Sequence, residues 1–159
     1  MSRINFIPAP QKRQALLLRN PVFKAFGRSP MAQHKQVDLA LAARVAFESV
    51  QHGTCNEADR DTLACVTNVC MVLAETHCSA DDLATALASQ EAMLRADGRA
   101  LQGKRWNFDG EGRSAMLAVL DIHEQLIAQL GQTAVTEALM EIMQRRARGQ
   151  VHRVELVKS

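Results

Sequence analysis

The sequence predicts an all-α protein, a bundle of about five helices with a basic N-terminal arm and a short basic C-terminal tail. Of its 159 residues 47% are hydrophobic, but these are mainly Ala, Leu, Val and Met, with no Tyr and one Trp. This mixture favours helices over strands. Apolar residues recur at helical spacing from residue 37 onward, which indicates a helical bundle. All four prolines lie in the first 35 residues, where they would interrupt a long helix.

The charged residues also divide the chain into an arm, a bundle and a tail. Residues 1–36 carry seven bases and no acid, residues 37–144 seven bases and sixteen acids, and residues 145–159 five bases and one acid. The segment charges are therefore +7, −9 and +4. We divide the chain into a basic arm (1–36), a helical bundle (37–149) and a tail (150–159). An acidic body with basic ends is typical of arms that contact nucleic acid or an acidic protein surface, although a solvated tail has the same composition.

The first two helices of the bundle are predicted from apolar spacing. The helix over 37–53 places Leu41, Val45 and the neighbouring alanines on one side, and Gly53 is a typical C-terminal stop. The helix over 56–77 carries apolar side chains on nearly all of its faces. A helix of this kind belongs in the middle of a bundle.

Two further helices follow. The third begins at the capping residue Ser79 and ends near Gly98 or Gly103. The fourth carries apolar residues and one histidine at spacings of four, three, four and three: Met116, Leu120, His123, Ile127 and Leu130. This seven-residue pattern suits the bundle core and equally suits the seam of a homodimer. On such a stripe, His123 is expected to be a hydrogen-bonded core residue.

The last helix is predicted between two glycines. Gly131 closes the fourth helix, Thr133 caps the fifth, and Gly149 ends it. The tail beyond it is expected to form a short strand or an extended arm. The final helical turn contains three arginines that either complement the carbonyl end of the helix dipole or contact phosphate: Arg145, Arg146 and Arg148.

The arm supplies five bases as candidate contacts to nucleic acid or to a partner protein: Lys12, Arg13, Arg19, Lys24 and Arg28. Its segment NPVFKAFG places Phe23 and Phe26 at helical spacing after Pro21, a residue suited to the first turn of a helix. This segment is expected to dock onto the bundle or onto a partner.

The stretch GKRWNFDGEG (103–112) has several interpretations. Its acids and glycines imitate the first half of a calcium-binding EF-hand loop, but Ala118 stands where the closing Glu belongs. Its glycine spacing does not match a phosphate loop. The stretch is therefore expected to be a turn whose Trp106 and Phe108 pack under the end of the bundle. The alternative is an exposed recognition loop that binds nucleic acid or a partner through Lys104, Arg105 and Trp106.

Cysteine and histidine residues suggest a weaker metal hypothesis. The pairs His52/Cys55 and His77/Cys78 are zinc ligand types, but they bracket a helix about 30 Å long. One ion would need a broken helix or a dimer to reach both pairs, so no metal and no cofactor is predicted. The four cysteines are expected to be reduced thiols. Because the chain has no serine elbow, paired-carboxylate motif or cofactor fingerprint, we expect that it is not an enzyme.

Five segments in this order carry a resemblance: NPVFKAFG, HGTCNEAD, MVLAE, QEAMLR and WNFDGEG. The chain resembles, over residues 19–150, small helical accessory proteins of proteobacterial phages, prophages and plasmids. The resemblance implies a bacterial cytoplasm and a gene of a mobile element, and it assigns no catalytic or binding residue. Such proteins commonly bind DNA or disable a host defence protein.

The chain also lacks an apolar run of about 18 residues, the length that crosses a bilayer, and a cleavable signal.

Three function hypotheses follow. The first is a non-enzymatic interaction protein that inhibits a host nucleic-acid-handling or defence complex, with the acidic residues 37–144 occupying a surface built for phosphates. The second is a DNA-binding accessory factor whose arm bases contact phosphate, although the charge of −9 on residues 37–144 argues against broad DNA contact. The third is a metal protein or enzyme that uses the Cys and His groups. The expected partners are a host or defence protein, nucleic acid, or a second copy of the chain.

Overall fold

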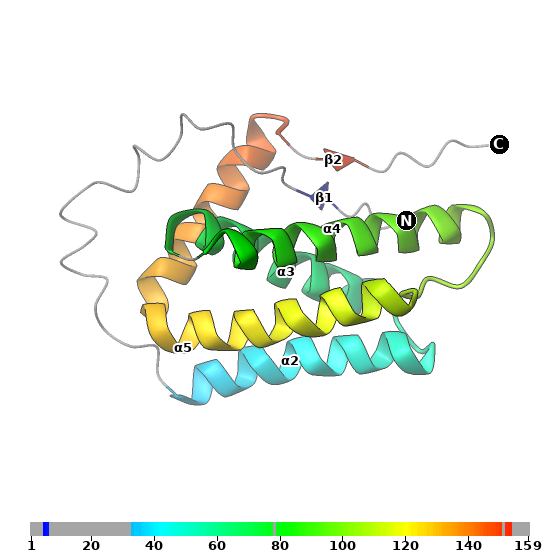
Figure 1. Ribbon diagram of the computed structural model, residues 1–159, viewed down its shortest axis with the longest axis horizontal. Helices are drawn as coiled ribbons and strands as arrows, with labels where there is room; N and C mark the ends of the chain where they lie inside the picture. Colours follow the sequence, from blue (N-terminus) through cyan, green and yellow to red (C-terminus); the bar gives the residue numbers. More distant parts are fainter. Residues whose placement is uncertain (1–4, 7–32, 78, 151, 154–159) are drawn as a thin grey trace.

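In the residues that the structure describes, the regular structure consists of α-helices and two very short strands. A computed structural model describes residues 5–6, 33–77, 79–150 and 152–153. Its helices are α2 (Gln33–His52), α3 (Glu57–His77), α4 (Ala80–Leu101) and α5 (Gly110–Ala147), and its strands are β1 (Asn5–Phe6) and β2 (His152–Arg153). Over these residues the predicted all-α bundle is confirmed (Figure 1). Most of the predicted basic arm lies outside the described residues.

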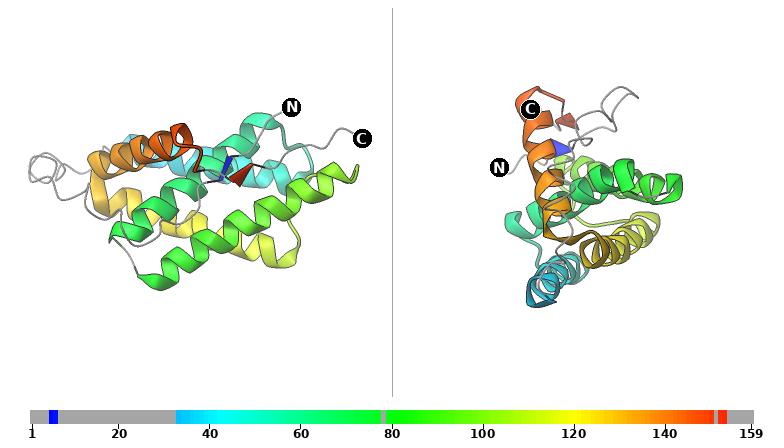
Figure 2. Two further views of the ribbon diagram at one scale, coloured as in Figure 1. Left: turned by 90° about the horizontal axis from the view of Figure 1, so that it is seen from above. Right: turned by 90° about the vertical axis from the view of Figure 1, so that its left-hand side faces the viewer.

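α3 is the central helix of the bundle. It packs against α2, α4 and α5, and its residues are buried almost continuously from Leu63 to Ala74. α4 and α5 also pack against each other, while α2 contacts α3 and α5 at the edge of the bundle (Figures 1 and 2). The prediction that this helix, apolar on nearly all faces, lies in the middle of the bundle is confirmed.

Several predicted helix ends are confirmed. Ser79 caps α4, because its Oγ accepts a hydrogen bond from the Asp82 N–H while its own N–H donates to the Asp82 carboxylate, both at 3.2 Å. Gly53 and Gly103 follow the ends of α2 and α4 with φ of 70° and 76°. The alternative end at Gly98 is not used, since Gly98 lies inside α4.

The side of α2 on which the spacing placed Leu41 and Val45 is exposed. Leu41 is 59% exposed and Val45 is 54% exposed. The buried side chains of α2 are Ala43, Ala46, Phe47 and Val50. Spacing alone could not choose between two faces that both carry apolar residues. The buried face is favoured because its alanines allow close packing while the Phe47 ring stacks on the Phe108 ring, 6.2 Å between centroids.

α5 bends at Gly131. This residue has φ of 78° and ψ of 175° inside the helix, a conformation that is essentially restricted to glycine. The sequence analysis placed a boundary between two helices here, and the backbone does leave the helical conformation at this residue. Helical structure resumes directly afterwards, so the described residues contain four helices, with α5 changing direction at the bend (Figures 1 and 2).

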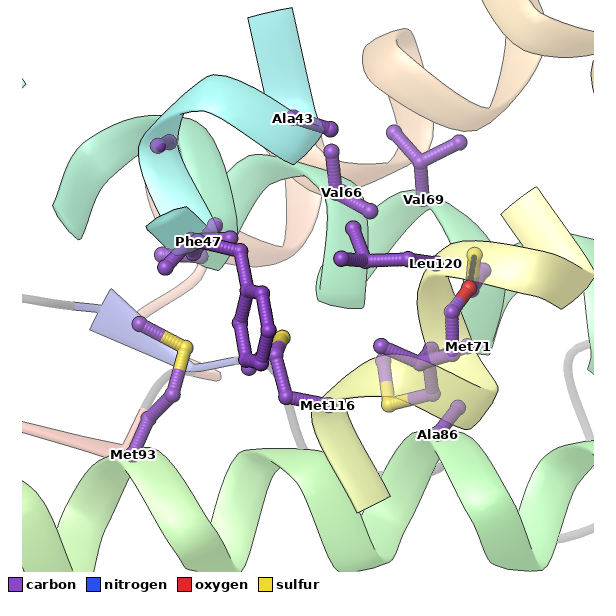
Figure 3. Close-up of a cluster of buried hydrophobic side chains, with 14 of the residues drawn as sticks. Ala43, Phe47, Val66, Val69, Met71, Ala86, Met93, Met116 and Leu120 are labelled. Atoms are coloured by element: carbon purple, nitrogen blue, oxygen red, sulfur yellow. Dashed lines mark hydrogen bonds between the residues drawn. The ribbon is translucent and has the colours of Figure 1, made fainter. Parts of the chain in front are cut away.

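The core is formed by side chains from all four helices (Figure 3). The seven-residue stripe of α5 faces inward, because Met116, Leu120, His123 and Ile127 are buried. The stripe is therefore part of the core, one of the two places that its spacing allowed. The expected hydrogen bond of His123 is missing at Nδ1, which is buried and finds no partner among the described residues. Burial lowers the pKa of His123, so its imidazole is neutral at pH 7.

Replacing Gly131 with alanine is expected to destabilise the protein by about 1–3 kcal/mol, because a Cβ disfavours this backbone conformation. Gly98→Ala is the matched control. A Cβ at Gly98 would meet no atom within 4 Å, and alanine inside a helix is expected to raise stability by about 0.5–1 kcal/mol. Urea unfolding followed by circular dichroism measures both changes. Effects of the same sign and size would contradict this account of the bend.

Candidate interaction surface at the paired chain ends

The first and last described segments of the chain meet in a small antiparallel ladder. β1 pairs with β2, Asn5 opposite Arg153 and Phe6 opposite His152. β1 also contacts α3, and the ladder lies on the side of the bundle away from α2 (Figures 1 and 2). The beginning of the basic arm is therefore held beside the basic tail. The predicted arm contacts lie outside the described residues: Lys12, Arg13, Arg19, Lys24 and Arg28.

The end of α5 leads the chain into β2. Gly149 adopts φ of 72°, and its N–H donates to the Arg146 carbonyl at 3.1 Å while the Gln150 N–H donates to the Arg145 carbonyl at 2.9 Å. These two bonds form a Schellman motif, which needs a left-handed residue in its glycine position. The predicted stop at Gly149 is confirmed, and β2 shows that the tail forms a short strand.

Arg145 is buried, which removes it from the predicted binding residues. Its side chain is 5% exposed, and its two terminal nitrogens donate to the Glu75 carboxylate at 2.7 and 3.1 Å while Nε donates to Glu141 at 2.7 Å. These bonds tie the last part of α5 to the end of α3. Burial raises the pKa of Glu75, and the hydrogen bonds from Arg145 oppose that shift. Arg145 faces inward because its position in the last turn lies on the same helical face as buried Ala138.

Arg146 and Arg148 are exposed, as a binding role requires. Among the described residues, the hydrogen bond seen for the Arg148 side chain is a long one to the Gln144 side chain, 3.4 Å. Both arginines lie within six residues of β2 along the chain. We call β1, β2, Arg146 and Arg148 together the paired-end surface.

The loop after α4 is a structural turn. Trp106 is 7% exposed, and its Nε1 donates to the Asp97 carboxylate at 2.6 Å. Its ring meets Phe108 edge to face, 5.3 Å between centroids, and the Arg60 guanidinium lies over it at 5.9 Å. The prediction that Trp106 packs under the end of the bundle is confirmed, and its ring is not exposed for recognition.

Asp109 organises the start of α5. It is the N-cap residue, and its carboxylate accepts the Gly112 N–H at 2.7 Å, Arg95 Nε at 3.0 Å and Arg99 Nη1 at 3.3 Å. The hydrogen bonds from Arg95 and Gly112 lower the pKa of Asp109 to about 2. The stretch DGEG therefore forms the N-terminal cap of α5. This role of Asp109 was not predicted, although an Asp directly before a helix and two Arg one turn apart are recognisable signals in the sequence.

Most bases of the bundle gather around this loop, a clustering that the sequence analysis did not recognise. Lys104 and Arg105 are exposed, as predicted, and the Arg105 guanidinium lies so close to Gly53 that a Cβ there would collide with it. Six of the seven bases of residues 37–144 lie near the loop: Arg60, Arg95, Arg99, Lys104, Arg105 and Arg113. The seventh, Arg44, binds Asp121 and Glu124 at 2.5 and 2.7 Å.

The rest of the described bundle surface is acidic. Three bases of residues 37–144 are exposed, whereas eight acids are exposed: Asp38, Glu48, Glu57, Asp61, Asp81, Glu91, Glu111 and Asp121. Other acids have structural roles, as Glu75, Asp97 and Asp109 do. The excess of acids over bases that residues 37–144 have in the sequence therefore persists at their surface, with more positive charge at the loop than composition alone indicated.

The candidate zinc ligands remain apart. His52 and Cys55 precede α3, whereas His77 ends it, and Cys78 lies outside the described residues. His52 lies 3.6 Å from the Glu48 carboxylate, and Cys55 is a free thiol. In the part of the chain that the structure describes, no three His, Cys, Asp or Glu side chains are placed to hold a metal ion.

Comparison of the chain with protein-family models, curated proteins and solved structures finds no match. Among the described helices, none combines the length and the hydrophobicity that crossing a bilayer requires. The proposals below therefore rest on the residues and geometry of this chain.

Replacing Arg145 with methionine is expected to destabilise the protein by about 3–5 kcal/mol at pH 7, because the buried Glu75 carboxylate loses its counter-charge. Arg146→Met is the matched control, since it removes an exposed cation from the next position and is expected to change stability by less than about 0.5 kcal/mol. Urea unfolding of both variants measures the difference.

The effect of Arg145→Met should also depend on pH. Burial already raises the pKa of Glu75, and loss of Arg145 raises it further. A carboxyl whose folded pKa exceeds its unfolded pKa stabilises the fold below the unfolded pKa and loses this contribution as pH rises through the folded pKa. The stability gap between variant and wild type should therefore narrow as pH falls from about 7 to about 5. A gap that stays constant would show that Glu75 is not the source of the effect.

Proposed function

We propose that the protein is a non-enzymatic interaction protein that binds nucleic acid through its paired basic ends. The observation that supports this proposal is the β1–β2 ladder, which joins the two basic segments of the chain. Seven bases lie in residues 1–36, and four others belong to the tail or to the exposed last turn of α5: Arg146, Arg148, Arg153 and Lys158. Bases that act from two segments held together can contact neighbouring phosphates of one strand or duplex.

The acidic surface of the bundle restricts where nucleic acid could bind. Exposed acids outnumber exposed bases over residues 37–144, so the bundle would repel a polyanion that lay across it. The paired-end surface lies away from α2 (Figure 1), which lets nucleic acid approach the basic ends without crossing that helix. We therefore propose a local contact at the ends, in which the bundle faces away from the nucleic acid.

DNA binding should weaken steeply with salt. Fluorescence anisotropy with labelled duplex and single-stranded DNA, measured between about 50 and 200 mM salt, gives a slope of log affinity against log salt of about −0.9 for each phosphate contacted on a duplex. Arg146→Gln together with Arg148→Gln should reduce the magnitude of this slope by about 2. Lys104→Gln together with Arg105→Gln, the matched exposed pair at the loop, should leave it unchanged. Absence of binding at low salt, or equal effects of the two pairs, would falsify the proposal.

The second candidate is an inhibitor of a nucleic-acid-handling or defence complex of a bacterial host, encoded by a mobile element. It is supported by the excess of exposed acids on the described bundle, eight against three bases. Here the acids would occupy a partner's phosphate-binding surface. A pull-down from nuclease-treated bacterial lysate should recover a nucleic-acid-binding protein with wild type and lose it with Asp81→Asn and Glu91→Gln. Recovery that survives these changes, or no recovery at all, would exclude this candidate.

A further inference from the structure

The last part of α5 exposes large apolar side chains to solvent. After the bend at Gly131, Leu139 is 39% exposed, Met140 51% and Met143 69%. Met143 is the most exposed large apolar side chain in the described part of the chain. We call Leu139, Met140 and Met143 the methionine surface.

The methionine surface has the spacing of a helix-packing seam. Thr136, Met140, Met143 and Ala147 are all exposed and follow one another at intervals of four, three and four residues, the repeat that lines one face of a helix for a second helix. The opposite face of this part of α5 is already used, since Val135, Ala138 and Arg145 are buried. The exposed seam therefore has room for a partner helix without any change in the bundle.

The positive charge at the end of this seam favours an acidic partner. The exposed arginines Arg146 and Arg148 lie in and directly after the last turn of α5, and Arg146 is one helical turn from Met143. Methionine side chains are flexible and polarisable, and they recur on surfaces that receive amphipathic helices. We infer that the methionine surface is a docking site for an acidic amphipathic helix of another protein, with its apolar residues on Met140 and Met143 and its carboxylates on Arg146 and Arg148.

A second copy of this chain fits the surface less well. Two copies packed through the methionine surface would each bring Arg146, Arg148 and a basic chain end to one interface, where like charges repel. The exposed stripe of α2, which contains Leu41 and Val45, has a different surrounding. Its exposed charged neighbours include Asp38 and Glu48, and its base Arg44 is already paired with Asp121 and Glu124. Among the described residues the stripe therefore offers an acidic helix no unpaired cation, and it serves as an internal control.

This inference goes beyond nucleic-acid binding, because it depends on apolar contact, and the two activities can be separated. Arg146 and Arg148 belong to the paired-end surface and would also contact the docked helix, so an acidic helix and DNA should compete for the protein. Loss of Met140 and Met143 should weaken helix binding and leave DNA binding intact. Loss of the two arginines should weaken both.

The test is an NMR titration of the full chain labelled with ¹³C at the methionine methyl groups. The probe is a synthetic helical peptide with Leu on one face and Glu along its flanks. The methyl signals of Met140 and Met143, assigned from Met140→Ser and Met143→Ser, should shift, whereas those of buried Met71, Met93 and Met116 should not. The double variant should weaken peptide binding about tenfold or more, which is at least about 1.4 kcal/mol.

Two controls define the specificity. Leu41→Ser together with Val45→Ser changes the exposed α2 stripe and should leave peptide binding unchanged. A peptide with Lys in place of Glu should bind about tenfold more weakly, because it meets Arg146 and Arg148. The inference is overturned if the Glu peptide causes no shift, if the Lys peptide binds equally well, or if Met140 and Met143 shift with protein concentration alone, which would identify a second copy as the occupant.

Discussion

The buried ion pair between Arg145 and Glu75 fixes the part of the molecule on which the proposed functions depend. Beyond Gly131, the last part of α5 buries few large apolar side chains, and Val135 and Ala138 are its fully buried apolar residues. Hydrophobic burial alone would hold it weakly. Arg145 makes three hydrogen bonds to Glu75 and Glu141, and such complete pairing is the condition under which a buried charge is tolerated. The pair also fixes orientation, because a bidentate contact allows one geometry.

The position of the chain end follows from this orientation. Once Arg145 points into the bundle, Arg146, at the next position round the helix, must point elsewhere, and the Schellman motif at Gly149 turns the chain toward β2. β2 then pairs with β1, which joins two basic segments separated by most of the sequence. The same rotation of α5 leaves Met140 and Met143 outside. One inward-facing arginine thus determines both the basic surface and the apolar surface next to it.

Local signals in the sequence predicted much of the fold. The glycines that follow α2, α4 and α5, the Ser79 cap and the central place of α3 were predictable because each depends on a few neighbouring residues. The rotation of α2 was not, since Leu41 and Ala43 lie on faces that are both apolar and only contact with α3 and α5 distinguishes them. The inward turn of Arg145 was hidden for a similar reason, because its partner Glu75 is 70 residues away. The ladder of two-residue strands leaves no periodic signal at all. The arginines that bind Asp109 lie one turn apart on α4, but their contact with Asp109 depends on how α4 meets α5.

Disulfide trapping tests whether Arg145 controls the pairing of the chain ends. Cysteines introduced by Asn5→Cys and Arg153→Cys occupy opposed positions of the ladder, where paired residues are about 4.5–5.5 Å apart, close enough for a disulfide. Mild oxidation followed by peptide mapping should show an intramolecular bond between positions 5 and 153, and adding Arg145→Met should strongly reduce its yield. An equal yield with and without Arg145, or no bond in either protein, would contradict the account.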